Sequence, residues 1–173
     1  MKKNVLVSGP PGAGKTTLIK EVLKELKLDG GGFYTSEIRE QNKRLGFKII
    51  TLDGKEGILA HRNIKTPYRV SKYSVNIKDL EEIGVKSILN ALKENKIVVI
   101  DEIGKAEMFS DKFRKAVEVA LNSKNKVFGT IKMTSDSFTD KIRRRKDTEV
   151  FYLTRENWQE VKAKIKEFIF DAL

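Results

Sequence analysis

The sequence predicts an α/β fold built on a mostly parallel sheet. Apolar runs rich in β-branched residues, such as residues 97–100, are typical of strands that a parallel sheet buries on both faces. Segments with apolar residues at helical spacing follow these runs, and this alternation indicates right-handed crossovers between parallel strands. No repeat or linker divides the 173 residues, so we expect one domain over residues 1–173.

The first half of the chain predicts an interruption of this pattern. Residues 4–28 read as a strand, a glycine-rich loop and a helix. Short apolar segments separated by tight turns come next, and they predict an inserted antiparallel hairpin or meander. Its expected strands are 33–38, 45–52 and 57–60. We expect residues 63–78 to be irregular.

The second half predicts the remaining strands and helices. The expected strands are 96–101, 126–131 and 149–153, and the expected helices are 79–92, 111–121, 135–145 and one from Thr154 to about Phe170. Ser110 or Asp111 is the expected cap of the second of these helices. The first helix should bury Leu80, Ile83, Ile88, Leu89 and Leu92, and the last should bury Trp158, Val161, Ile165, Phe168 and Ile169.

Residues 9–16 fit the phosphate-binding pattern G-x-x-x-x-G-K-[ST] between a strand and a helix. Glycines let successive N–H groups point at phosphate oxygens, and the start of the helix adds its positive dipole end. Lys15 is expected to reach the β- and γ-phosphates, and the Thr16 hydroxyl to bind Mg²⁺. The predicted nucleotide-binding residues here are Gly9, Pro10, Pro11, Gly12, Ala13, Gly14, Lys15, Thr16 and Thr17.

A second motif follows the apolar run 97–100. Asp101 and Glu102 stand at the end of this strand, as in a Walker B motif, where ligands of open α/β sheets bind. We expect Asp101 to hold Mg²⁺ together with Thr16, and Glu102 to polarise a water for attack on the γ-phosphate. Proteins with this acidic pair resemble the RecA-like class, in which an additional strand separates the P-loop strand from the Walker B strand.

The loop after the acidic pair completes the predicted site. Ile103, Gly104, Lys105 and Ala106 are expected to lie along the nucleotide, with Gly104 in a tight turn. Lys105 is a candidate for neutralising charge on the γ-phosphate, with Glu107 fixing its side chain. A surface ion pair explains the last two residues equally well. The predicted catalytic residues are Lys15, Asp101, Glu102 and Lys105.

Four segments resemble the THEP1 family of small nucleoside-triphosphatases: GPPGAGKTTL, GGFYTSEIRE followed by RLGFKI, VVIDEIGKAE and VFGTI. The resemblance covers most of the chain in matching order. It implies a three-layer P-loop fold similar to RecA-like ATPases and Mg²⁺-dependent hydrolysis of nucleoside triphosphates with broad base tolerance. Ala106 departs from the methionine expected in many relatives, which looks like a change in packing.

Several other residues have a structural explanation that is at least as good as a functional one. Thr130 senses a γ-phosphate only if its strand lies beside the Walker B strand. Arg39 and Arg44 are expected to be exposed side chains of the hairpin. The run Arg143–Arg145 is expected to be an exposed helix face; alternatively, it forms a lid over a phosphate group or contacts nucleic acid. The single histidine, His61, is expected to be structural. The aromatic residues Phe33, Tyr34, Phe47 and Trp158 can stack on a base but mostly fit core patterns.

Composition limits the environment and the partners. The net charge of +11 favours anionic partners, among which nucleotides suffice and nucleic acid is not favoured. The absence of cysteine excludes disulfides and thiolate metal sites. We find no membrane-spanning stretch and no room for a signal peptide, so we expect a cytoplasmic protein that is a monomer or weak oligomer.

Three functions remain open from the residues. The leading one is hydrolysis of ATP, GTP, CTP or UTP to the diphosphate and phosphate. A small nucleoside or nucleotide kinase fits the size, although Glu102 argues against it because an activated water competes with an acceptor hydroxyl. A nucleotide-switched module that binds RNA or protein is the non-enzymatic alternative.

Overall fold

A single mixed sheet forms the centre of the molecule. The computed structural model describes residues 2–171, and within this range nine strands join in the order β5-β6-β4-β3-β2-β7-β8-β1-β9. The strands are β1 (Asn4–Ser8), β2 (Gly30–Glu40), β3 (Lys43–Thr51), β4 (Glu56–His61), β5 (Arg69–Val70), β6 (Tyr73–Val75), β7 (Ile97–Ile103), β8 (Val127–Ile131) and β9 (Thr148–Tyr152).

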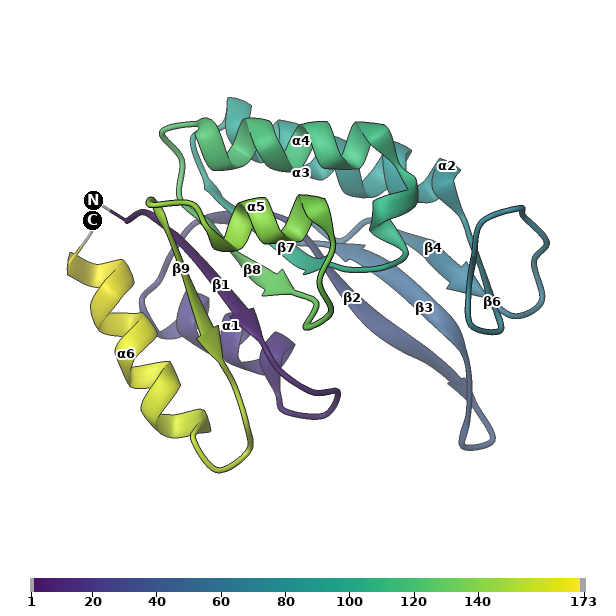
Figure 1. Cartoon of the computed structure of the whole chain (residues 1–173), viewed down its shortest axis with the longest axis horizontal. Helices are drawn as coiled ribbons and strands as arrows, with labels where there is room; N and C mark the ends of the chain where they lie inside the picture. The colour runs from purple at the N-terminus through teal and green to yellow at the C-terminus, as the bar shows by residue number, and fades with distance from the viewer. Residues whose placement is uncertain (1, 172–173) are drawn as a thin grey trace.

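Helices cover both faces of this sheet, which makes three layers (Figure 1). On one face lie α1 (Lys15–Glu25) and α6 (Trp158–Asp171). On the other lie α3 (Lys86–Lys93), α4 (Asp111–Asn122) and α5 (Ser137–Arg143), together with the short α2 (Ile77–Asp79) and a π-helical turn over Leu80–Val85. Within residues 2–171 no helix combines the length and apolar character needed to cross a bilayer.

The strand order confirms the additional-strand arrangement. Strand β8 lies between β1, which leads into the P-loop, and β7, which carries Asp101 and Glu102. The pairings β2–β7, β7–β8, β8–β1 and β1–β9 are all parallel. Because parallel strands end at the same edge of a sheet, the P-loop and the acidic pair lie at the same edge, with the end of β8 between them.

Alternating side chains explain why the central strands are apolar on both faces. Val5 and Val7 of β1 pack with α1 and α6, whereas Leu6 between them packs with the helices of the opposite face. Strand β7 alternates in the same way, with Val98 and Ile100 on one side and Val99 on the other.

The inserted meander is present and larger than predicted. Strand β2 pairs in parallel with β7 through Gly30–Phe33 and then extends beyond it in an antiparallel hairpin with β3. The prediction for residues 63–78 was wrong, because β5 and β6 form there and β6 pairs with β4. Strands of two and three residues are too short to show an alternating hydrophobic pattern in the sequence. They form because they pair with the rest of the sheet.

Two further predictions needed correction at their ends. The helix predicted over 79–92 contains the π-helical turn, and Leu89 is 42% exposed instead of buried. The final helix begins at Trp158, because Thr154 and Asn157 exchange hydrogen bonds in a turn before it. By contrast, the Ser110 hydroxyl caps α4 by accepting from the N–H of Phe113 at 3.0 Å, as expected.

We predict that Gly129→Ala destabilises the fold strongly. A Cβ at this position of β8 would lie 2.1 Å from the carbonyl oxygen of Ile100 in β7, so the two central strands must separate. We expect a loss of about 2–3 kcal/mol in the free energy of unfolding, measured by denaturant titration. Gly84→Ala is the matched control, since its nearest neighbour would lie at 3.4 Å. Equal stability of the two variants would contradict the close approach.

Candidate active site

The loop between β1 and α1 wraps as a phosphate-binding loop. Gly9, Gly12 and Gly14 have φ angles of 153°, 79° and 90°, which other residues adopt only with strain. Gly14 directly precedes the first residue of α1, so the positive end of the helix faces the loop. The geometry therefore provides the anion-binding cradle that the sequence predicted.

Lys15 folds back over this loop. Its Nζ donates hydrogen bonds to the carbonyl oxygens of Gly9 at 2.7 Å and Pro10 at 3.2 Å. Thr17, Pro11 and Gly12 are exposed, and Ala13 is buried. The Lys15 ammonium thus lies at the loop, where a phosphate bound to the cradle would attract it.

Asp101 is the best-held group of the site. Its carboxylate is only 3% exposed and accepts hydrogen bonds from the hydroxyls of Thr16 at 2.5 Å and Thr130 at 2.8 Å. The backbone of Thr35 also favours the charged form of this carboxyl group. Burial raises the pKa of Asp101, and the two hydroxyls together with the backbone donor oppose that rise.

The residues around Asp101 fit a magnesium ion. The Thr16 hydroxyl, in the first turn of α1, donates to the Asp101 carboxylate near the end of β7. Hard oxygen donors of this kind suit Mg²⁺, which usually takes one or two protein ligands and completes its shell with water and substrate phosphates. The sequence predicted Thr16 and Asp101 together, but it considered Thr130 as a γ-phosphate sensor or a strand-end hydroxyl and not as a donor to Asp101.

Glu102 and Glu107 flank Gly104 closely. A Cβ at Gly104 would lie 2.8 Å from Cγ of Glu102 and 2.9 Å from Oε2 of Glu107, so only glycine fits between them. Glu107 is 2% exposed. Burial and the charge of Glu102 raise the pKa of Glu107 well above its usual range. Burial and the charge of Asp101 likewise raise the pKa of Glu102, although Lys15 lowers it.

This arrangement corrects the expected partner of Lys105. Glu107 is buried beside Gly104, whereas Lys105 is exposed, and among residues 2–171 the two form no ion pair. The sequence of this loop gave no sign that Glu107 would be buried, because an acidic residue close to a basic one is usually part of an exposed ion pair. The Ile103 side chain is fully buried and Ala106 packs against the core, so these two can face a nucleotide only through the main chain.

The loop after β9 contributes two residues that the sequence did not assign to the site. Arg155 Nε donates to the carbonyl oxygen of Gly12 at 3.1 Å, and Trp158 Nε1 donates to that of Gly14 at 3.0 Å. These contacts bring the start of α6 onto the P-loop, more than 140 residues away in the chain. Trp158 was predicted as core, and it does pack against the core beside α1 while also bonding the loop.

The remaining candidates are structural in this geometry. Arg143 donates to the carbonyl oxygen of Lys132, and Arg145 pairs with Asp147 at 2.7 Å, so only Arg144 of that run is exposed. In the hairpin, Glu37 pairs with Arg39 at 2.6 Å and with Arg44 at 3.2 Å. His61 Nδ1 accepts from the N–H of Asn63 at 3.0 Å.

A P-loop, a buried carboxylate bonded to its threonine, a glutamate beside that carboxylate and an intervening strand define a P-loop nucleoside-triphosphatase of the additional-strand type. A family model described as NTPase matches residues 4–166. The nucleoside-triphosphatase THEP1 of Thermotoga sp. (strain RQ2) is 55% identical over 153 residues, which cover 88% of this chain and 87% of the relative. The chain belongs to this nucleoside-triphosphatase family and is a hydrolase acting on nucleoside triphosphates.

More distant relatives share the fold over nearly their whole length. The crystal structure of THEP1 from Aquifex aeolicus matches with a TM-score of 0.87 and 33% identity, covering 96% of this chain and 98% of that one. The solution structure of a human cancer-related nucleoside triphosphatase matches with a TM-score of 0.84 and 34% identity, covering 99% of each chain. The family expected from the four sequence segments is therefore confirmed.

We predict that Glu107→Gln stabilises the nucleotide-free protein as the pH rises. The raised pKa keeps a proton on native Glu107 that the unfolded chain releases above about 4.5. Wild-type stability should therefore fall with rising pH in that range, whereas a neutral amide removes this dependence. Denaturant unfolding at pH 5 and pH 8 measures the effect, with exposed Glu118→Gln as the control. A variant less stable than wild type at pH 8 would show that Glu107 is ionised in the native state.

Proposed function

We propose that this chain hydrolyses nucleoside triphosphates to diphosphates and phosphate with Mg²⁺ and with broad tolerance of the base. The observation that carries this proposal is the position of Glu102. Glu102 is half-buried and directly follows Asp101, whose carboxylate is hydrogen-bonded to Thr16. It is also close enough to Lys15 for the lysine charge to lower its pKa. A carboxylate in that place suits the activation of water better than the binding of an acceptor molecule.

The chain positions the triphosphate through its P-loop. The N–H groups of residues 9–16 and the Lys15 ammonium hold the β- and γ-phosphates, and Lys15 exchanges its carbonyl partners for phosphate oxygens. Asp101 and Thr16 would hold the magnesium ion, which when bound neutralises phosphate charge. Exposed Lys105 can swing toward the charge that develops on the γ-phosphate.

Glu102 prepares the attacking water. Its carboxylate accepts a proton as the water oxygen bonds to the γ-phosphorus, and the bond to the bridging oxygen breaks to release the diphosphate. The raised pKa of Glu102 makes it a stronger base than an exposed glutamate. Glu107 is buried on the other side of Gly104.

The mouth of the P-loop supports broad base tolerance. Arg155, exposed and bonded to Gly12, offers a planar guanidinium on which the π-face of any base can stack. This side of the site reads the shape of a base more than its hydrogen-bonding edge. We also propose that the chain acts as one domain over residues 1–173, in the cytoplasm, as a monomer or weak oligomer.

The proposed activity is tested by phosphate release from ATP, GTP, CTP and UTP, with Mg²⁺ and with EDTA. We expect the four rates to agree within about tenfold, because no group is placed to read one base, and EDTA to abolish turnover. A preference above about a hundredfold for one nucleotide would refute base tolerance. Label transferred from ATP to an added nucleoside would favour the kinase instead.

We predict that Glu102→Gln separates binding from turnover. The amide keeps the shape of the side chain but cannot take a proton, so kcat should fall about 10²–10⁴-fold while nucleotide affinity stays near wild type. Lys15→Ala should lose both, and Lys24→Ala, an exposed lysine later on α1, should lose neither. Wild-type hydrolysis by Glu102→Gln would show that another group activates the water.

A further inference from the structure

One 22-residue segment of the chain carries positive charge without any acidic residue. Residues 57–78 contain five Lys or Arg and no Asp or Glu, so five of the eleven excess positive charges lie within these 22 residues. Each of the five is exposed, and none forms an ion pair within the part of the chain that the structure describes. They are Arg62, Lys65, Arg69, Lys72 and Lys78.

Some cations elsewhere in the described residues have acidic partners, whereas none of these five does. Lys162 contacts both Glu21 at 3.0 Å and Glu25 at 2.6 Å, and Lys132 contacts Asp136 at 2.6 Å. Unpaired cations close together in sequence repel each other and raise the local potential. Such a cost is offset when an anionic partner binds.

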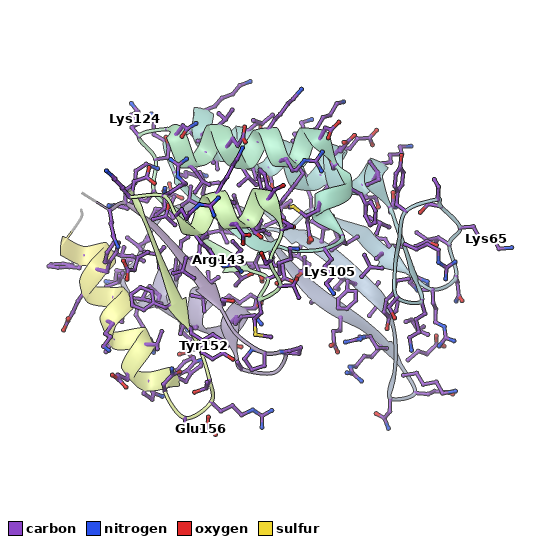
Figure 2. The ribbon with its side chains drawn as sticks, in the orientation of Figure 1. Lys65, Lys105, Lys124, Arg143, Tyr152 and Glu156 are labelled. Atoms are coloured by element: carbon purple, nitrogen blue, oxygen red, sulfur yellow. The ribbon has the colours of Figure 1, made fainter. Side chains whose placement is uncertain are left out.

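The segment is held in place at the end of the sheet. Strand β5 is the outermost strand, and Figure 2 shows Lys65 at the extreme of the molecule on that side. The Tyr68 carbonyl oxygen accepts from the N–H of Val75 at 2.7 Å, and the Thr66 hydroxyl donates to the Val75 carbonyl oxygen at 2.8 Å. The cations therefore project from a loop fastened to β6.

An exposed pair of aromatic rings adjoins these cations. The rings of Tyr68 and Phe109 lie 5.5 Å apart between centroids at 48°, and each residue is 41% exposed. Arg69 follows Tyr68 directly in the chain. Exposed aromatic faces beside unpaired cations are the two elements that grip single-stranded nucleic acid, since rings stack with bases and cations bind phosphates.

We propose that this surface binds single-stranded nucleic acid. The basic edge surface consists of Arg62, Lys65, Tyr68, Arg69, Lys72 and Phe109. An acidic peptide would satisfy the cations but would leave the two rings without planar partners. The proposal goes beyond nucleotide hydrolysis, because the surface is separate from the P-loop. Phe109 nevertheless ends the short helix Glu107–Phe109, whose first residue lies beside Gly104, so a bound strand would touch the loop that follows the catalytic carboxylates.

The test is fluorescence anisotropy of a labelled oligo-dT of about 12 nucleotides, without nucleoside triphosphate and at several salt concentrations. Tyr68→Ala should weaken binding about tenfold through lost stacking. The double variant Arg69→Gln with Lys72→Gln should also weaken binding. It should reduce the slope of the logarithm of the binding constant against the logarithm of the salt concentration by about 1.4, as the loss of two phosphate contacts requires. Phosphate release from ATP by these variants should stay at the wild-type rate.

The matched control is Lys124→Gln with Lys146→Gln. Both lysines are exposed, the charge change is the same, and Figure 2 places Lys124 far from Lys65. This variant should bind the oligonucleotide like wild type. Equal weakening by the two double variants would overturn the proposal, because net charge alone would then explain binding.

Two competition arms complete the experiment. An excess of unlabelled ATP should leave the labelled strand bound, and complete displacement would overturn the proposal by placing the strand in the P-loop. A duplex of the same length should bind more weakly, and equal affinity would contradict stacking on Tyr68 and Phe109. Because no hydrolysis is measured in these arms, their outcome is independent of whether the proposed triphosphatase activity holds.

Discussion

The hydrogen bonds to the buried Asp101 carboxylate connect the parts on which the site depends. Thr16 brings the start of α1 to this carboxylate, and Thr130 brings the end of β8. A buried carboxylate without such donors would be costly, so each donor is constrained by the need to satisfy it. One buried carboxylate thus connects the end of β7 to the end of β8 and to the helix that follows the P-loop.

The intervening strand gives this arrangement its geometry. With β8 between β1 and β7, the P-loop and the acidic pair are two strands apart, and Thr130 fills the position between them. The peptide bond between Asp101 and Glu102 is cis, and the pairing of β7 with β8 shifts register between Ile100 and Ile103. The shift occurs at Asp101 and Glu102 of the candidate site, in keeping with the tendency of irregular strand pairing to lie beside active sites.

Charge is used in two ways in this protein. Around α1 and α6, lysines and glutamates neutralise each other, and Lys162 joins the two helices through Glu21 and Glu25. Such exposed pairs each contribute little to stability. At the end of the antiparallel extension the cations have no acidic neighbours in the sequence. Charges of both signs therefore offset each other around α1 and α6, whereas residues 57–78 carry a positive potential that attracts anions.

The sequence by itself determined the features that depend on contiguous residues. The P-loop, the Walker B strand, the Ser110 cap and the inserted meander each follow from a local pattern, because turns, caps and strand periodicity are local. The sequence also indicated the additional strand, but only through the resemblance suggested by the Asp101–Glu102 pair. Only the tertiary structure decided which distant groups meet. Thr130 reaches Asp101 because β8 pairs with β7, Arg155 reaches Gly12 because β9 lies beside β1, and Glu107 is buried on the side of Gly104 opposite Glu102. These contacts depend on packing between segments far apart in the chain, and no local pattern records such packing.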